Sequence, residues 1–224
     1  MKLAITGASG KTGFRVAEEA LAKGYSIRLL VRRTSVLPES LKNCERVNIN
    51  LFNPTELQNG LEGCDSLIIA TGARPSIDLT GPARIDAIAV QRQVEVCKKI
   101  KLNRIILVSS LCAGKFFHPL NLFGLILIWK KIGESSLQSS GLDWTIIRPG
   151  GLNENEDNLN DEGIYFSSEN KQEEGSIPRR LVARSCIESL NTKSSLRKII
   201  EITSNTKQQK ISMEKALNNY NKYE

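Results

Sequence analysis

Short, almost uninterrupted apolar runs alternate along the chain with longer stretches in which apolar residues recur at helical spacing. Apolar runs of this length predict strands that are buried on both faces, as the strands of parallel sheets are. The predicted strands are residues 3–6, 26–31, 46–49, 66–70, 104–110 and 144–149.

The stretches between these runs have the apolar spacing of amphipathic helices. Pro54 suits the start of the second stretch, and Gly24 and Gly63 close the first two. Strands and helices that alternate in this way predict an α/β fold with a doubly wound, Rossmann-like parallel sheet. The predicted helices are residues 11–23, 54–63, 83–102 and 123–140.

The chain changes character after Gly151, where polar and acidic loops surround shorter elements. This part is too small for a core of its own. We therefore interpret residues 1–224 as one Rossmann-like domain in which residues 151–224 form a small substrate-side region. Its predicted elements are a strand at 164–167, a helix at 177–190, a strand at 198–203 and a terminal helix at 213–224.

The most apolar stretch is LNLFGLILIW, residues 120–129. It is much shorter than the roughly 20 residues that a membrane-spanning helix needs, so no membrane span is expected. The sequence favours a helix packed in the core, with a partner-facing or membrane-facing patch as the alternative. The chain enters a strand at once, and we expect no signal or transit peptide.

The composition is that of an ordinary soluble globular protein, with 40% hydrophobic and 25% charged residues. A formal net charge of +7 favours an anionic partner, but the basic residues are scattered, which makes nucleic acid an unlikely partner. The five cysteines form no CxxC pair, and most of them sit inside apolar patterns. They predict buried, reduced thiols in a cytoplasmic protein without a metal site.

Three glycines follow the first predicted strand in TGASGKTG, residues 6–13. A nucleoside triphosphate loop would need GxxxxGK[ST], and the interval from Gly7 to Gly10 is too short for it. Two interpretations remain: a glycine turn without a ligand, and a dinucleotide-binding loop. At the first strand–helix joint of an alternating chain the second is favoured: Gly7 allows a sharp turn, Gly10 lets the backbone approach a pyrophosphate, and Gly13 allows close helix packing.

The end of the second strand indicates which dinucleotide is bound. NAD-selective folds carry an acid there that binds the ribose 2′-hydroxyl. Here Arg32 and Arg33 stand at that place, and Lys11 lies in the glycine loop. Guanidinium groups suit a 2′-phosphate by charge and by their forked donors, so the sequence favours NADP(H) over NAD(H), although two solvated surface arginines would give the same pattern.

The motifs TGASGKTG, LVRR, LVSS and WTIIRPGGL together resemble the atypical short-chain dehydrogenase/reductases of the NmrA-like kind. The similarity is greatest to small NADP-binding members from plants and cyanobacteria, and it covers residues 2–202. It implies a Rossmann domain with a small C-terminal substrate region. The cofactor contacts that the motifs and the resemblance together predict are Gly7, Ala8, Ser9, Gly10, Lys11, Thr12, Gly13, Arg32, Arg33, Leu51, Ala70, Thr71, Gly72, Ala73, Ser109, Lys130, Pro149 and Gly150.

Leu51 departs from the family at the adenine pocket. Members of the family often have an aspartate at this position, near the adenine amino group. Here Leu51 stands between Asn50 and Asn53, so a backbone group or an asparagine would have to replace that single contact.

The resemblance also implies a catalytic set, which this chain has only in part. Many short-chain dehydrogenases use Tyr-x-x-x-Lys, with a lysine that orients the nicotinamide ribose and a tyrosine that donates a proton. Lys130 falls at the lysine position, but the tyrosine position is Ile126, and the serine position falls at Ser109 or Ser110. His118 is the one histidine; it is a candidate proton donor or substrate contact, or else a loop residue with a local hydrogen bond.

Two hypotheses about function follow. The first is an NADP(H)-binding reductase-like protein that transfers hydride to a small acceptor, such as a quinone, flavin, tetrapyrrole or carbonyl compound. The second, which the missing tyrosine favours, is a catalytically weak NADP(H)-sensing regulatory or assembly-factor protein with a protein partner of unknown identity. A nucleotide-sugar epimerase is disfavoured, because that chemistry depends on the missing tyrosine.

Overall fold

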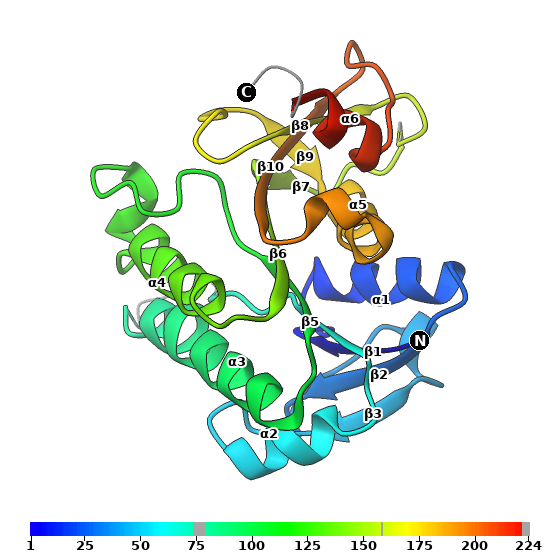
Figure 1. Cartoon of the computed structure of the whole chain (residues 1–224), viewed down its shortest axis with the longest axis vertical. Coiled ribbons are helices and arrows are strands. Elements are labelled where there is room, and N and C mark those ends of the chain that lie inside the picture. Colours follow the sequence, from blue (N-terminus) through cyan, green and yellow to red (C-terminus); the bar gives the residue numbers. More distant parts are fainter. Residues whose placement is uncertain (74–78, 158, 221–224) are drawn as a thin grey trace.

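The computed structural model describes residues 1–73, 79–157 and 159–220, and its centre is a twisted, mostly parallel sheet (Figure 1). The strand order is β3-β2-β1-β4-β5-β6-β10-β8, and of these described strands only β8 runs antiparallel to its neighbour. The doubly wound Rossmann-like fold is therefore confirmed. The strands are β1 (Lys2–Thr6), β2 (Ser26–Val31), β3 (Glu45–Asn48), β4 (Ser66–Ile69), β5 (Arg104–Val108), β6 (Asp143–Pro149), β8 (Gly163–Ser167) and β10 (Lys198–Asn205).

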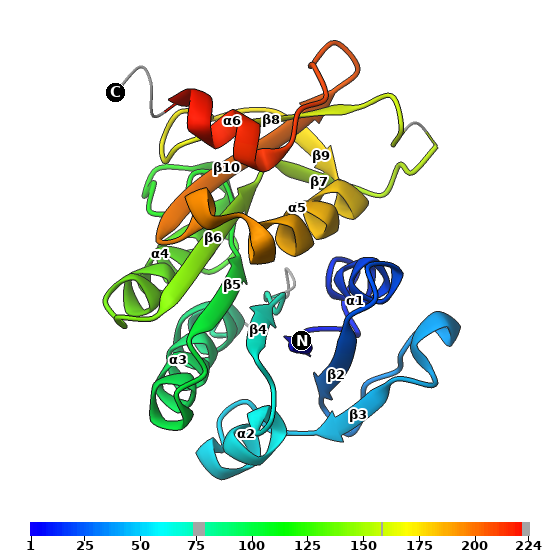
Figure 2. The ribbon, with the colours of Figure 1, turned by 45° about the vertical axis from the view of Figure 1, so that its right-hand side comes forward.

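Helices cover both faces of this sheet, which is why its central strands are apolar on both sides (Figures 1 and 2). Along β1, Leu3 and Ile5 belong to one buried cluster and Ala4 to the other, as the alternation of a strand requires. The first cluster includes α1 (Gly13–Ala22), α5 (Arg179–Asn191) and α6 (Met213–Tyr220). The second includes α2 (Pro54–Leu61), α3 (Ala89–Ile100) and α4 (Ile126–Gln138).

The strand order reverses between β1 and β4. From β1 the chain moves outward to β2 and β3, then returns to β4 on the other side of β1. The carboxyl ends of these parallel strands meet at one edge of the sheet. Ligands of doubly wound folds bind in the crevice at such a reversal, so the fold places the glycine loop, the end of β2 and the end of β4 together.

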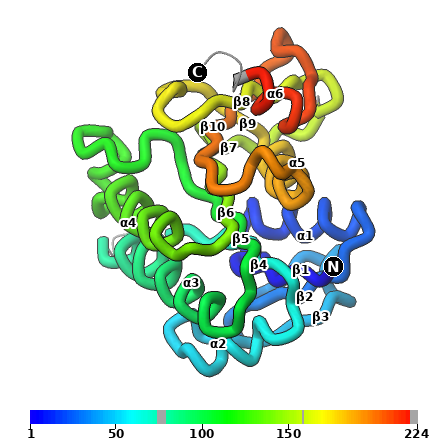
Figure 3. The backbone as a smooth tube through the Cα atoms, in the orientation of Figure 1, coloured from blue at the N-terminus to red at the C-terminus, as the bar shows by residue number. Residues whose placement is uncertain are grey.

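The backbone after β6 gathers at one end of the molecule (Figure 3). Two short strands in this region, β7 (Gly151–Asn153) and β9 (Ser176–Pro178), pair in parallel and were not expected from the sequence. Their approach depends on Gly150, because a Cβ there would lie 2.6 Å from the carbonyl oxygen of Gly175. Strands of three residues are too short to show an apolar periodicity in the sequence.

The apolar stretch 120–129 differs from the expectation of a core helix. Its first half is a 3₁₀ turn, Pro119–Leu122, and α4 begins only at Ile126. Leu122 is 82% exposed and Phe123 49% exposed, whereas Leu127 is buried. The prediction of a fully buried helix was therefore wrong for residues 120–125. In the described ranges, none of the helices has the length and hydropathy required to cross a bilayer.

Candidate functional site

The glycine loop turns sharply between β1 and α1. Gly7 has a φ of +84°, and a Cβ on it would lie 2.5 Å from the carbonyl oxygen of Ala70. A Cβ on Gly13 would lie 2.1 Å from the Gly7 carbonyl oxygen, while the N–H of Gly10 donates to that same oxygen at 2.8 Å. A side chain at Gly7 or Gly13 would therefore displace the backbone. Glycine at these positions keeps the tight turn that brings the backbone N–H groups at the start of α1 toward a ligand.

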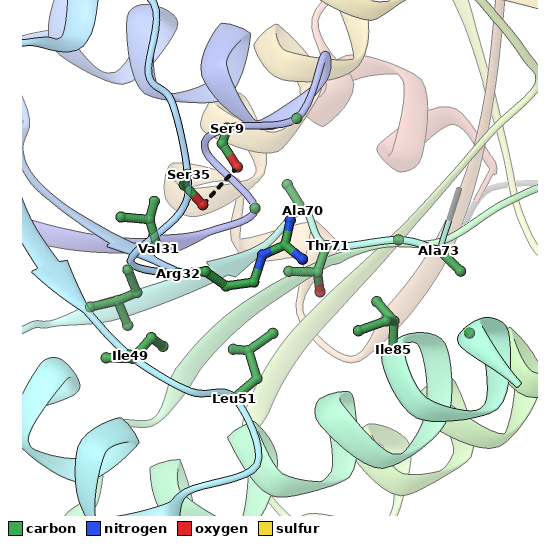
Figure 4. A pocket seen from close by; sticks show the side chains of 15 residues that line it. Ser9, Val31, Arg32, Ser35, Ile49, Leu51, Ala70, Thr71, Ala73 and Ile85 are labelled. Atoms are coloured by element: carbon green, nitrogen blue, oxygen red, sulfur yellow. Dashed lines mark hydrogen bonds between the residues drawn. The ribbon is translucent and has the colours of Figure 1, made fainter. Parts of the chain in front are cut away.

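A cavity of about 360 Å³ opens in front of this loop (Figure 4). Its walls come from the glycine loop, the carboxyl ends of β2 and β4, and the chain leading out of β3 and into α3. The lining residues are Gly7, Ser9, Gly10, Leu30, Val31, Arg32, Ser35, Ile49, Leu51, Ala70, Thr71, Gly72, Ala73, Gly81 and Ile85.

Arg32 brings a charged side chain to this lining, and Figure 4 shows it extending into the cavity between Leu51 and the Ser9–Ser35 pair. The turn that carries it is held from β3, where the Arg46 guanidinium donates to the carbonyl oxygens of Arg32, Arg33 and Ser35 at 3.2–3.4 Å. Both arginines are exposed, but only Arg32 belongs to the lining of the cavity. The structure thus separates two arginines that the sequence treats alike.

The opposite wall of the cavity is apolar. Ile49, Leu51 and Ile85 are spread along it (Figure 4). Such a wall can pack against the face of a flat heterocycle. It offers no carboxylate at position 51, in agreement with the departure seen in the sequence, so recognition of an adenine amino group by a side chain is absent at that position.

Two buried hydroxyl groups at the carboxyl ends of β4 and β5 lack hydrogen-bond partners within the described part of the chain. They are Thr71 Oγ1 and Ser109 Oγ, and Ser109 is only 7% exposed. An unpaired buried hydroxyl costs free energy that a ligand can recover by hydrogen bonding. Both groups lie where the family motif predicts cofactor contacts, and they fit a dinucleotide with many hydroxyl and phosphate oxygens.

Lys130 lies on the first turns of α4 and forms an ion pair with Asp86. The distance from Lys130 Nζ to Asp86 Oδ1 is 2.8 Å, and the side chains are 13% and 2% exposed. The ammonium lies near the lining residue Gly72, because a Cβ built on Gly72 would be 3.8 Å from Nζ. The lysine predicted to hold the nicotinamide ribose therefore reaches the cavity rim at the end of β4.

The tyrosine position and His118, the two places where the sequence suggests an acid, have other contacts. Ile126, at the tyrosine position, packs against the small apolar cluster of Leu111, Cys112 and Leu127. His118 Nδ1 accepts the N–H of Leu120 at 3.2 Å and so caps the 3₁₀ turn. Its contact is the local hydrogen bond that the sequence left open as the alternative to a proton donor.

Comparison with known proteins agrees with this geometry. Residues 7–193 match the sequence model of a family described as NAD(P)H-binding. The chain belongs to this NAD(P)H-binding family. The expected resemblance to Rossmann proteins of the short-chain dehydrogenase/reductase group is confirmed, and the finer NmrA-like assignment stays a prediction.

Relatives of this NAD(P)H-binding chain include several plant proteins. An uncharacterised chloroplastic protein of Arabidopsis thaliana is 34% identical over 90% of this chain and 76% of its own length. Protein TIC 62 of Pisum sativum is 32% identical over 90% of this chain, but the chain spans only 42% of that protein. Sanguinarine reductase of Eschscholzia californica is 29% identical, with 83% and 82% of the two chains covered.

Solved structures share the fold of the NAD(P)H-binding chain at lower identity. A protein from Bacillus halodurans described as an NAD-dependent epimerase/dehydratase gives a TM-score of 0.84 at 23% identity, covering 98% of this chain and 99% of its own. A short-chain dehydrogenase/reductase from Veillonella parvula, in complex with NADP, gives 0.73 at 17% identity, covering 90% and 94%.

The family's predicted cofactor residues fall into two groups. Those that line the cavity are Gly7, Ser9, Gly10, Arg32, Leu51, Ala70, Thr71, Gly72 and Ala73. Those that lie outside its lining are Ala8, Lys11, Thr12, Gly13, Arg33, Ser109, Lys130, Pro149 and Gly150.

Several members of the second group have other contacts. Lys11 pairs with Glu154, and that hydrogen bond lowers the pKa of the Glu154 carboxyl. Thr12 Oγ1 accepts from the Arg179 guanidinium at 2.9 Å. Pro149 ends β6, and its carbonyl oxygen accepts a backbone N–H at 2.9 Å. Lys11 and Thr12 still stand at the N-terminus of α1, so their backbone N–H groups remain candidates for a pyrophosphate.

The sequence did not identify Ser35, Ile49, Gly81, Ile85 or Asp86 as members of the site. The first four belong to loops or apolar patterns that carry no motif. Asp86 had a signal, since it interrupts the apolar pattern of the predicted helix 83–102. For metal binding, the described residues contain no group of three or more histidine, cysteine or acidic side chains close enough to hold an ion.

Proposed function

We propose that the protein prefers NADP(H) to NAD(H) and is a reductase that transfers hydride to a small acceptor. The observation that carries this proposal is the Arg32 guanidinium inside the cavity at the end of β2, where an NAD-selective fold would place an acid. Ser35 lies beside it and could add a hydroxyl donor to a 2′-phosphate. The NADP complex of the Veillonella parvula protein supports the same choice.

Different residues of the chain bind different parts of the cofactor. The glycine loop offers backbone N–H groups to the pyrophosphate, and the apolar wall of Ile49, Leu51 and Ile85 receives the adenine. The unpaired hydroxyls of Thr71 and Ser109 and the ammonium of Lys130 lie toward the nicotinamide end. When bound, the cofactor supplies the hydride.

The chemistry around Lys130 favours acceptors that take their proton from solvent. The helix α4 has no tyrosine, Ile126 cannot donate a proton, and the hydrogen bond seen for His118 is its local cap through Nδ1. A quinone, flavin or tetrapyrrole meets this condition more easily than an unactivated carbonyl compound. The relative sanguinarine reductase is by its name a reductase, in agreement with hydride transfer to a small acceptor.

A second function, NADP(H) sensing, is favoured by the same Ile126. A protein that binds the cofactor without a proton donor could report its redox state to a partner protein. The two functions differ in turnover and share the cofactor site.

Anaerobic oxidation of NADPH against a panel of quinones, flavins, tetrapyrroles and carbonyl compounds tests the reductase proposal. We expect turnover above background with a conjugated acceptor. NADPH that binds tightly in calorimetry but is not oxidised by any class would support sensing. Absence of NADPH and NADH binding would refute both.

A further inference from the structure

Asp86 connects two parts of the site that are far apart in the sequence. Its Oδ1 accepts from Lys130 Nζ at 2.8 Å, and its Oδ2 accepts from the backbone N–H of Ala73 at 3.2 Å. Ala73 belongs to the segment after β4 that lines the cavity, and Lys130 belongs to α4. Both oxygens of one carboxylate, only 2% exposed, thus bind groups on two sides of the cavity rim.

The backbone around Asp86 is held in an unusual conformation. Residues Ala83–Ile88 form a π-helical turn before α3 begins. A Cβ on Gly133 of α4 would lie 2.2 Å from the backbone carbonyl oxygen of Asp86, so the two helices meet closely at this glycine. Single π-helical turns are rare and are frequent at functional sites when they occur. Here the turn directs a buried carboxylate at Lys130.

The burial of this pair requires a reason beyond packing. A buried carboxylate is costly unless it is paired, and hydrophobic residues of similar volume often stabilise a protein as well or better. Lys130 carries three donors on its ammonium, and Asp86 accepts one of them. The ammonium also lies near Gly72 of the cavity lining. An ammonium fixed at this place can offer its other donors to a ligand in the cavity.

We propose that Asp86 is a positioning residue for the cofactor: it fixes the Lys130 ammonium and the Ala73 segment in one arrangement at the nicotinamide end of the site. This inference rests on the proposed NADP(H) binding. Asp86 acts through Lys130 and does not touch the ligand. Without the carboxylate, Lys130 loses its defined position.

A double-mutant cycle on NADPH affinity tests this role without depending on turnover. The variants are Asp86→Asn, Lys130→Met and the two combined, with binding measured by calorimetry. Asn keeps the shape of Asp and an oxygen for the Ala73 N–H. We expect each single variant to bind about tenfold more weakly, as for one lost charge-assisted hydrogen bond. The double variant should also be about tenfold weaker, because both changes remove the same interaction.

The outcomes separate the alternatives. A double variant about a hundredfold weaker would show that the two residues act independently and would overturn the proposal, as would unchanged affinity in Asp86→Asn. If Asp86 had a purely structural role, Asp86→Asn would lower Tm and leave the NADPH affinity of the folded protein unchanged. Asp65→Asn is the matched control, because Asp65 accepts the N–H of Lys2 at the opposite edge of the sheet, and it should bind as the wild type does. Wild-type protein that binds no NADPH would instead refute the proposed function.

A measurement on the wild-type protein guards against a variant that fails to fold. In ¹⁵N NMR spectra the ammonium signal of Lys130, assigned by its loss in Lys130→Arg, should be visible without cofactor because ion pairing and burial slow proton exchange. Addition of NADP⁺ should shift it. A signal that is absent in both states, or that NADP⁺ leaves in place, would overturn the proposal.

Discussion

The Arg148 guanidinium and the Glu134 carboxylate face each other through two hydrogen bonds, and neither side chain is exposed. Arg148 Nε donates to Glu134 Oε1 at 2.9 Å, and Nη2 donates to Oε2 at 2.7 Å. Burial alone would lower the pKa of Arg148, but the hydrogen bonds and charges of Glu134, Glu169 and Glu201 raise it above its ordinary value. The pair ties α4 to β6, and Lys130 lies one helical turn before Glu134.

Glu134→Gln should therefore destabilise the fold. Removal of the Glu134 charge leaves the buried Arg148 with only Glu169 and Glu201, at 2.9 and 3.4 Å, and removes its bidentate partner. We expect a loss of about 3 kcal/mol in the free energy of unfolding. For a chain of this size this corresponds to a Tm lower by roughly 10 °C. Thermal unfolding followed by circular dichroism measures it. Glu95→Gln is the control, because Glu95 pairs with Arg92 on the exposed side of α3 and should change Tm very little. Equal Tm values for the two variants would contradict a stabilising role of the buried Arg148–Glu134 pair.

The two arginines after β2 should differ in their effect on cofactor choice. Arg32→Ala should weaken NADPH binding by about 1.5–3 kcal/mol, roughly tenfold or more, while NADH affinity stays the same. Arg33→Ala is the matched control, because its side chain lies outside the cavity lining. Calorimetry with both nucleotides measures the preference. Equal losses for the two variants, or a wild type that binds NADPH and NADH alike, would exclude Arg32 as the 2′-phosphate contact.

The second glycine of the loop should tolerate a side chain in the fold but not in the complex. A Cβ on Gly10 would lie 3.2 Å from the Gly7 carbonyl oxygen, which is tight, and a valine there would stand between the backbone and the pyrophosphate. Gly10→Val should fold and lose detectable NADPH binding. Gly151→Val, where a Cβ makes only ordinary contacts, should keep it. If Gly10→Val bound NADPH normally, the loop would serve only as a turn.

The sequence predicted the central strands of the sheet well because they are short apolar runs that can be recognised without knowledge of their neighbours. It also placed the glycine loop and Arg32, since both follow from position relative to a strand end. It did not separate Arg32 from Arg33, because Arg46 on β3 sets that turn through three backbone carbonyl oxygens. Asp86, too, could not be assigned, as its partners Ala73 and Lys130 meet it only through tertiary packing.

The thiols should be largely unreactive in the folded protein. Burial raises the pKa of Cys97 and of Cys186 to about 12, so almost no thiolate is present at these two positions at neutral pH. We expect iodoacetamide to modify only the partly exposed Cys44 and Cys64 in the native state and all five cysteines in urea. Mass spectrometry of the labelled peptides measures this. Native labelling of Cys186 would contradict it. The cytoplasmic location inferred from these cysteines stays a prediction.

The last prediction concerns Lys130 and the missing tyrosine. Lys130→Ala should weaken NADPH binding by about 1–2 kcal/mol, as for one lost charged hydrogen bond. Lys131→Ala is the control, because Lys131 pairs with Glu169 and is 36% exposed. Any reductase activity should lack the steep pH dependence of a tyrosine acid. Ile126→Tyr tests the same logic in reverse: a hydroxyl one turn before Lys130 could permit weak carbonyl reduction, although Ile126 packs against an apolar cluster, where the hydroxyl would lack a partner. An NADP complex with the Lys130 ammonium turned away from the ribose would refute the assignment and favour the sensing function.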